Sequence, residues 1–260
     1  MPRFSANLGF LWPDRPLLAR IDAAARVGFR AIELHWPYDV PAAEVKAACA
    51  RHDLALLGLN TVVGEASRGE FGLGALPGRE ADFQASVDQS IAYCLASGAG
   101  SIHTMAGVVA PGQRAKARET LLRNLQAASK KAATHGLTLL LEAINPRDKA
   151  DYFYATVGEA AGVIADLGAA NVRLMFDTYH VGVAEGDILK RLERHFPVIG
   201  HIQIAAVPSR AEPDEGEIAY GAVFKAIDAL GYAGWIGCEY KPRGGTDAGL
   251  GWTTTLGVKL

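Results

Sequence analysis

The sequence predicts an α/β fold, a single-domain (β/α)8 barrel over residues 1–260. Short apolar segments alternate with amphipathic helical segments along the chain. Eight such pairs fit within about 250 residues, the usual length of this barrel. No linker, internal repeat or low-complexity tract divides the chain. An open doubly wound sheet is the alternative, but it would want a glycine-rich phosphate turn, and Asn7-Leu8-Gly9 does not supply G-x-G-x-x-G.

The expected strands are short apolar segments that end in, or next to, a polar residue. The clearest is residues 138–145, where three leucines precede Glu142. Gly136 and Asn145-Pro146 bound this segment, which is too short for a helix. A carboxylate at the end of a buried strand is costly unless it is paired, hydrogen-bonded, bound to metal or emerges into solvent. The other strands are expected at residues 4–8, 31–34, 54–59, 101–105, 172–176, 198–202 and 235–238.

Between these strands, apolar residues recur at helical spacing. Gly28 ends the first helix, and Pro41 marks the start of the second. Thr156 and Glu159 form a capping box at the start of a later one. The apolar helical faces lie at residues 17–25, 45–49, 83–95 and 223–230, and further helices are expected over residues 113–135, 156–167 and 187–195.

Residues 61–78 form a long, glycine-rich, irregular stretch. Because it carries Phe71, Leu73 and Leu76, it is expected to fold back over the barrel, and long loops of this kind often act as lids. A surface loop without such a role is the alternative.

Composition excludes several classes of function. A net charge of -2 with no long run of like charge argues against non-specific nucleic-acid binding, which needs a basic face. No apolar stretch is long enough to span a membrane, and the N-terminus lacks the pattern of a signal peptide. The widely separated Cys49, Cys94 and Cys238 predict neither a zinc knuckle nor a disulfide framework. A reduced, cytoplasmic setting is the simple interpretation.

The sharpest functional signal is a set of polar residues at successive strand ends. In a (β/α)8 barrel these ends meet at one face, where active sites lie. Glu142, Asp177, Gln203 and Glu239 lie 35, 26 and 36 residues apart, one βα step each. Three are acidic and would repel one another unless a cation lies between them, and oxygen ligands favour Mg²⁺ or Mn²⁺ over Zn²⁺. Four unrelated polar caps on exposed strand ends are the alternative.

Further candidates surround this set. His103 ends the fourth strand, and His180 lies in the loop after the sixth, so both are candidates for substrate contact, with a structural role as the alternative. His201 is expected to point into the barrel interior. Arg210, in the loop after the seventh strand, is suited to bind a carboxylate or polyol, although a solvated loop arginine would look the same in sequence.

Five stretches of sequence carry a resemblance to a known family. The strongest evidence for this resemblance is a long and specific stretch at residues 234–242, GWIGCEYKP. The others are ALPGREADF at 75–83, MAGVV at 105–109, FDTYH at 176–180 and HIQIA at 201–205. Over nearly its whole length the chain resembles hydroxypyruvate isomerase and 2-oxo-tetronate isomerase, which are xylose-isomerase-like TIM barrels.

The resemblance implies roles for individual residues. The four strand-end residues match the family's divalent-metal ligands, and two of them, Glu142 and Glu239, match its proton donor and acceptor. His180 and Arg210 match positions that contact substrate in related sugar isomerases and epimerases. Either Arg210 or Lys241 is expected to bind the carboxylate of the small-molecule 2-oxo acid substrate.

The implied reaction is an aldose–ketose type isomerisation through an enediolate. It converts hydroxypyruvate to 2-hydroxy-3-oxopropanoate (tartronate semialdehyde), or 2-oxo-tetronate to 3-oxo-tetronate. Residues 205–208, 241–244 and 249–252 resemble the four-carbon branch. A ketose 3-epimerase, an apurinic-type endonuclease and a non-catalytic sugar-acid binding protein are the alternatives. The sequence leaves open the choice of metal and the oligomeric state, with a homo-oligomer among the expected states.

Overall fold

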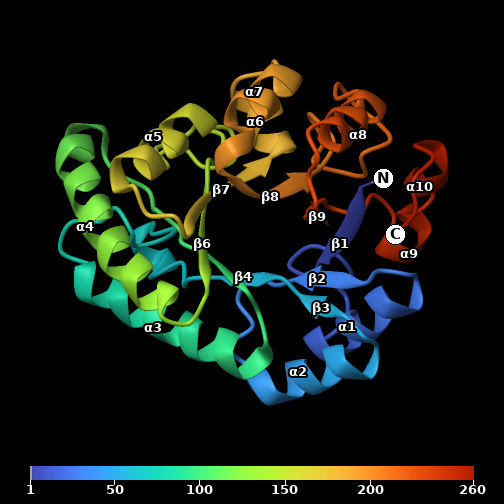
Figure 1. The fold of residues 1–260 in the computed structure, drawn as a ribbon, viewed down its shortest axis with the longest axis horizontal. Coiled ribbons are helices and arrows are strands. Elements are labelled where there is room, and N and C mark those ends of the chain that lie inside the picture. Colours follow the sequence, from blue (N-terminus) through green and yellow to red (C-terminus); the bar gives the residue numbers. More distant parts are fainter. Residues whose placement is uncertain (1) are drawn as a thin grey trace.

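The computed structural model describes residues 2–260, whose strands form one parallel sheet that curves into a nearly closed barrel. The strand order is β3-β2-β1-β9-β8-β7-β6-β5-β4, and the helices form an outer ring around the strands (Figure 1). This arrangement confirms the predicted barrel. The strands are β1 (Arg3–Asn7), β2 (Ala31–Glu33), β3 (Ala55–Leu56), β4 (Gly58–Asn60), β5 (Ser101–His103), β6 (Thr138–Glu142), β7 (Val172–Asp177), β8 (Ile199–Ile204) and β9 (Trp235–Cys238).

The third expected strand, residues 54–59, is two short strands that break at Leu57. The reason is a change of partner, because β3 pairs with β2 and β4 pairs with β5. The Leu57 N–H still donates to the Ile32 carbonyl at 2.9 Å, and the Leu34 N–H donates to the Gly58 carbonyl at 3.0 Å. These main-chain bonds bring the two ends of the sheet together, so one interrupted strand closes the eight-stranded pattern.

Two predicted helix starts are confirmed. Pro41 caps the second helix, and Thr156 accepts a hydrogen bond from the Glu159 N–H while the Glu159 carboxylate accepts one from the Thr156 N–H. The longer helices are α1 (Leu17–Arg26), α2 (Ala42–Arg51), α3 (Glu80–Ser97), α4 (Arg114–Ala133), α5 (Val157–Leu167), α7 (Ile188–His195) and α8 (Tyr220–Ala229). Shorter ones are α6 (Thr178–Ala184), α9 (Thr246–Gly249), α10 (Trp252–Thr255), η1 (Ala66–Arg68), η2 (Pro111–Gln113) and η3 (Phe196–Val198).

The placement of His180 in a loop was wrong, because α6 follows β7 directly. The Asp177 carboxylate accepts a hydrogen bond from the Tyr179 N–H at 2.8 Å and so caps this helix. Asp is a preferred residue at a helix N-terminus, so the signal was present in the sequence. With seven residues, however, α6 is too short to show a periodic apolar face.

Strand alternation decides which side chains enter the barrel. In β6, Leu139 and Leu141 are fully buried, whereas Leu140 lines a small interior cavity, on the same face as Glu142. In β8, His201 and Gln203 line that same cavity. The prediction that His201 points into the barrel interior is therefore confirmed.

The loop at residues 61–78 packs against the end of the barrel. Leu73 is buried, and the N–H groups of Gly74 and Ala75 donate to the carbonyls of Met105 and Ala106. Opening and closing of this loop stays a prediction. Within residues 2–260, no helix has both the length and the apolar character that crossing a bilayer requires.

Candidate active site

The four strand-end residues lie together at the carboxyl end of the barrel, where Glu142 and Glu239 line a cleft of about 520 Å³. Glu142 ends β6, Asp177 ends β7, Gln203 lies in β8 and Glu239 follows β9. All four residues are buried, each with at most 5% of its surface exposed. Single oxygen or nitrogen atoms of Glu142, Asp177, Glu239 and His180 lie within 4.8 Å of one another, and Gln203 donates to Glu239 at 3.4 Å.

The donor set fits a divalent metal. Glu142 Oε1, Asp177 Oδ2 and Gln203 Oε1 are buried oxygens with no hydrogen-bond partner among the described residues. An unpaired buried polar atom costs about 1–3 kcal/mol, which a bound cation would offset. Oxygen ligands of this kind suit Mg²⁺ or Mn²⁺.

The two glutamates have opposite electrostatic surroundings. Burial, with the charges of Glu239 and Asp177, raises the pKa of Glu142 well above its usual range. Burial alone would also raise the pKa of Glu239, but the hydrogen bond from His35 and the charge of Arg210 outweigh it and hold that pKa below its usual range. Titratable pairs with pKa values pushed apart are typical of acid–base sites.

Glu239 is held by more partners than any other member of the set. Its Oε1 accepts from Asn7 Nδ2 and lies 3.1 Å from His35 Nε2, and its Oε2 accepts from the Arg210 guanidinium at 2.7 Å. The His35 ring fits because residue 9 is glycine: a Cβ on Gly9 would lie 2.2 Å from the imidazole. The segments around residues 9 and 35 therefore position the Glu239 carboxylate, a candidate catalytic group.

His180 faces the cleft as a hydrogen-bond donor. Its Nδ1 accepts from the Asn145 main-chain N–H at 3.2 Å, which places the proton of the neutral ring on Nε2. Nε2 lies 3.6 Å from both Glu142 Oε1 and Asp177 Oδ2. Burial, and then Arg210, lowers the pKa of His180 to about 3, so the ring is neutral. This tautomer suits contact with a substrate oxygen better than metal ligation.

His103 also lines the cleft. Its Nδ1 lies 3.6 Å from Glu142 Oε2, and its Nε2 has no partner among the described residues. Burial lowers the pKa of His103 to about 4. The neutral ring can donate or accept one further hydrogen bond there.

Arg210 reaches across the cleft from the loop after β8. Its guanidinium binds Glu239 with one arm and Asp148 Oδ2, at 3.0 Å, with the other. It lies between the rings of Phe10 and Tyr179, at 4.8 and 4.9 Å from their centroids. Its main chain is left-handed, with a φ of 57°, a costly conformation that is typical of functional sites.

Lys241 also lines the cleft, and its main-chain N–H donates to the Arg210 carbonyl at 2.7 Å; its role in substrate binding stays a prediction. Sequence reasoning missed Lys149, whose ammonium lies 4.3 Å from the ring centroid of Phe71, a residue of the 61–78 loop. It also missed Asp148, which holds Arg210. Both lie in the loop after β6, and no spacing in the sequence marks them.

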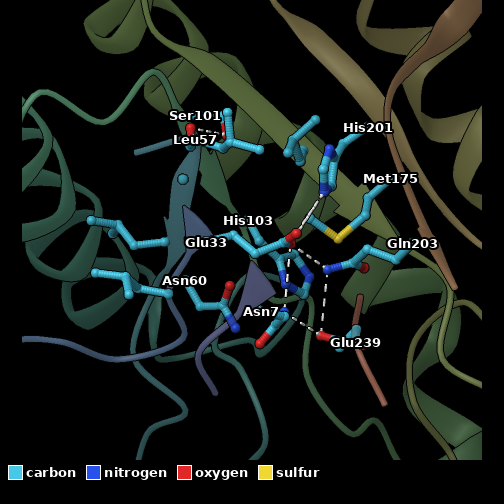
Figure 2. A pocket seen from close by; sticks show the side chains of 14 residues that line it. Asn7, Glu33, Leu57, Asn60, Ser101, His103, Met175, His201, Gln203 and Glu239 are labelled. Carbon is cyan, nitrogen blue, oxygen red and sulfur yellow. Dashed lines mark hydrogen bonds and ion pairs between the residues drawn. The ribbon is translucent and has the colours of Figure 1, made fainter. Parts of the chain in front are cut away.

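Deeper in the barrel, a polar network supports the site. Figure 2 shows Glu33, His201, Asn7, Gln203 and Glu239 joined by polar contacts, and together with His103 they line an interior cavity. Glu33 and His201 come from β2 and β8, 168 residues apart in the chain, and their side chains lie 3.1 Å apart. The interior cavity they line is about 20 Å³.

Comparisons with known proteins agree with this geometry. Residues 21–256 match the family described as xylose isomerase-like TIM barrel. The chain is 46% identical over 253 residues to 2-oxo-tetronate isomerase of Cupriavidus necator, covering 97% of both proteins. It is 37% identical over 253 residues to hydroxypyruvate isomerase of Escherichia coli, covering 97% of this chain and 98% of that protein.

Solved structures share the fold over nearly the whole chain. A Brucella melitensis protein described as AP endonuclease, family 2, superposes with a TM-score of 0.95 at 38% identity, covering 98% of this chain and 99% of that one. A D-psicose 3-epimerase from Clostridium cellulolyticum, with a TM-score of 0.78 at 17% identity over 92% of this chain and 84% of that one, shares the fold alone. The chain therefore belongs to the xylose isomerase-like TIM-barrel family, and it is an isomerase of the hydroxypyruvate isomerase and 2-oxo-tetronate isomerase type.

Proposed function

We propose that the protein isomerises a small 2-oxo hydroxy acid, with 2-oxo-tetronate as the preferred substrate and hydroxypyruvate as the second. One observation carries the proposal: two buried glutamates, Glu142 and Glu239, face one cleft from β6 and the end of β9 with their pKa values displaced in opposite directions. The naming of the Cupriavidus necator relative supports the four-carbon acid. A cytoplasmic location and a homo-oligomeric state stay predictions.

The reaction needs two proton transfers on neighbouring carbons. One glutamate takes a proton from the carbon that bears the hydroxyl group, which leaves an enediolate. The other glutamate gives a proton to the former carbonyl carbon, while the hydroxyl proton moves to the former carbonyl oxygen. His180, with its proton on Nε2, donates a hydrogen bond to a substrate oxygen and holds the substrate in register.

Glu142, Asp177, Gln203 and Glu239 would hold the Mg²⁺ or Mn²⁺ ion. Such an ion supplies a Lewis acid that makes the C–H bond next to the carbonyl more acidic. The buried oxygens without partners on three of these residues support this assignment.

The substrate's carboxylate needs a cation of its own. Both arms of Arg210 already bind Asp148 and Glu239. Lys149 and Lys241 remain as cations that line the cleft, and neither ammonium has a carboxylate partner within residues 2–260. Lys149 is half-buried and rests on Phe71, so it loses less freedom on binding an anion than the exposed Lys241. We therefore propose Lys149 as the first candidate for binding the substrate's carboxylate.

Replacing Lys149 with methionine is expected to raise the KM for the 2-oxo acid while kcat changes little. A hydrogen bond to a charged group contributes about 1.5–3 kcal/mol, which corresponds to roughly 10–100-fold in KM. Steady-state kinetics measures the effect. Lys116→Met, an exposed lysine of α4, is the matched control. If Lys149→Met leaves KM unchanged and Lys241→Met raises it, the carboxylate binds Lys241 instead.

The proposed function is tested by NMR in deuterium oxide with 2-oxo-tetronate and with hydroxypyruvate, with and without Mn²⁺. An isomerase places deuterium on the former carbonyl carbon. A ketose 3-epimerase, the main alternative, would return it to the carbon from which the proton left. Absence of turnover of both acids in the presence of Mn²⁺ would refute the proposal.

An endonuclease activity has less support from the site. The metal-capable group within the described residues has three carboxylates and one histidine, whereas apurinic-type endonucleases are expected to assemble a histidine-rich zinc site. The net charge of -2 also disfavours binding to DNA. Strong retention on DNA at low salt would revive this alternative.

A further inference from the structure

We infer that Glu33, a buried carboxylate at the end of β2, is a positioning residue that fixes the side-chain amide of Gln203 with its oxygen toward the metal. The inference rests on the proposed function, because it concerns a proposed metal ligand. Glu33 touches neither the cleft nor the reacting groups of the scheme above. Its side chain lines the interior cavity of the barrel beside Gln203 (Figure 2).

Glu33 is surrounded by groups that donate hydrogen bonds. Its Oε1 accepts from Ser5 Oγ at 2.9 Å, and its Oε2 accepts from Gln203 Nε2 at 2.7 Å. His201 Nε2 lies 3.2 and 3.1 Å from the two oxygens, and Asn7 Nδ2 lies 3.5 Å from Oε2. Carboxylate oxygens accept hydrogen bonds, so these neighbours fix the position of the Glu33 side chain, although the residue is only 5% exposed.

Strand β9, which lies next to β8, leaves space for the Glu33 carboxylate because residue 237 is glycine. A Cβ on Gly237, in β9, would lie 2.1 Å from Glu33 Oε1 and 2.9 Å from Gln203 Cγ. Any larger residue there would displace both side chains. The contact between Glu33 and Gln203 therefore depends on a glycine on a third strand, and the three residues act as one unit.

The two carboxylates beside Gln203 decide which way its amide faces. Gln203 Nε2 lies 2.7 Å from Glu33 Oε2 and 3.4 Å from Glu239 Oε1, so each of its two N–H bonds has an acceptor. Turning the amide over would place its oxygen against two other oxygens. The observed orientation leaves Gln203 Oε1 buried and without a partner, like Glu142 Oε1 and Asp177 Oδ2. Glu33 thus makes Gln203 an oxygen ligand.

This arrangement predicts an unusual effect of adding charge. A glutamate at position 203 would ordinarily be expected to bind a divalent cation more tightly than glutamine. Here its second oxygen would face Glu33 and Glu239 in place of the two N–H bonds. We therefore expect Gln203→Glu to weaken metal binding.

The test is Mn²⁺ binding to metal-free protein, measured from the EPR signal of free Mn²⁺. Glu33→Met removes the acceptor, and we expect an affinity about 10–100-fold lower than wild type, as for other lost partners of metal ligands. Glu33→Gln keeps one oxygen for the amide of Gln203 and gives its own amide to Ser5 Oγ. We expect its affinity to stay within about threefold of wild type, a smaller loss than the 10–100-fold expected for Glu33→Met.

Ser5→Ala is the matched control, because it removes a contact on the side of Glu33 away from Gln203, and it should bind Mn²⁺ like wild type. Thermal unfolding checks that each variant is folded. If Glu33→Met does not fold, retained binding in Glu33→Gln and weaker binding in Gln203→Glu still support the inference.

Three outcomes would overturn it. Unchanged binding in Glu33→Met would show that Gln203 needs no support. Equal losses in Glu33→Met and Glu33→Gln would show that Glu33 acts through its charge alone. Tighter binding in Gln203→Glu would show that the amide orientation has no role. A wild-type protein that binds neither Mn²⁺ nor Mg²⁺ would instead contradict the proposed function, and this inference with it.

Discussion

Replacing Glu239 with glutamine is expected to lower kcat by about 10²–10⁴-fold, the usual contribution of a positioned proton-transfer group. The amide cannot accept a proton from carbon, although it keeps the size of the side chain. The readout is the rate at which solvent deuterium enters the substrate, followed by NMR at saturating Mn²⁺. Saturation separates the loss of a proton-transfer group from the loss of a metal ligand.

The kcat of Glu142→Gln is expected to fall by a similar factor, because the scheme needs one glutamate for proton transfer at each of two neighbouring carbons. Glu193→Gln, on the exposed face of α7, is the control and should keep the wild-type rate. Deuterium exchange and net turnover both at the wild-type rate in Glu239→Gln would exclude the two-glutamate scheme. Exchange that survives with net turnover lost would instead leave Glu142 as the base and Glu239 as the acid.

Much of this site could be predicted from sequence because, in a parallel barrel, the polar residues that end successive strands all lie at the same end of the barrel. An apolar run that ends in a polar residue, such as the leucines before Glu142, places that residue at the mouth of the barrel. The period of two along a strand then places His201 and Gln203 on one interior face. Both steps depend only on local sequence and a regular register.

The parts that sequence reasoning missed depend on contacts between distant segments. The break at Leu57 follows from a change of strand partner, which no local pattern reveals. Lys149 enters the cleft through a turn after β6 and contacts Phe71, nearly 80 residues earlier in the chain. In the sequence, Glu33 is a polar residue near the end of an expected strand, and only its contact with Gln203 indicates a role for it.

Removing the divalent metal with a chelator is expected to abolish turnover, and re-binding of Mn²⁺ should weaken as the pH falls below about 8. Burial, and then the charge of Glu239, raises the pKa of Asp177 to about 8, and burial raises that of Glu142 as well. The raised pKa values favour the protonated forms of both carboxylates in the metal-free protein, and for Asp177 this holds below a pH of about 8. Only the ionised forms bind a metal, so binding must release protons.

The sign of the pH effect follows from this release. Below the raised pKa values, the apparent Kd for Mn²⁺ should increase about tenfold per pH unit for each proton released. Calorimetric titrations at pH 6, 7 and 8, in two buffers with different ionisation enthalpies, measure both the affinity and the number of protons. An affinity that stays constant from pH 6 to 8, without proton release, would show that Asp177 and Glu142 are already ionised.

The control for this experiment is a variant that removes one titrating ligand. Asp177→Asn should bind Mn²⁺ more weakly at every pH and release about one proton fewer than wild type. Equal proton release in the variant would locate the titration on another group. With the expected result, Asp177 and Glu142 stay protonated in the metal-free site until a cation replaces their protons, beside Glu239, whose pKa is lowered. This explains how three acidic side chains can lie within 4.8 Å of one another in a buried site.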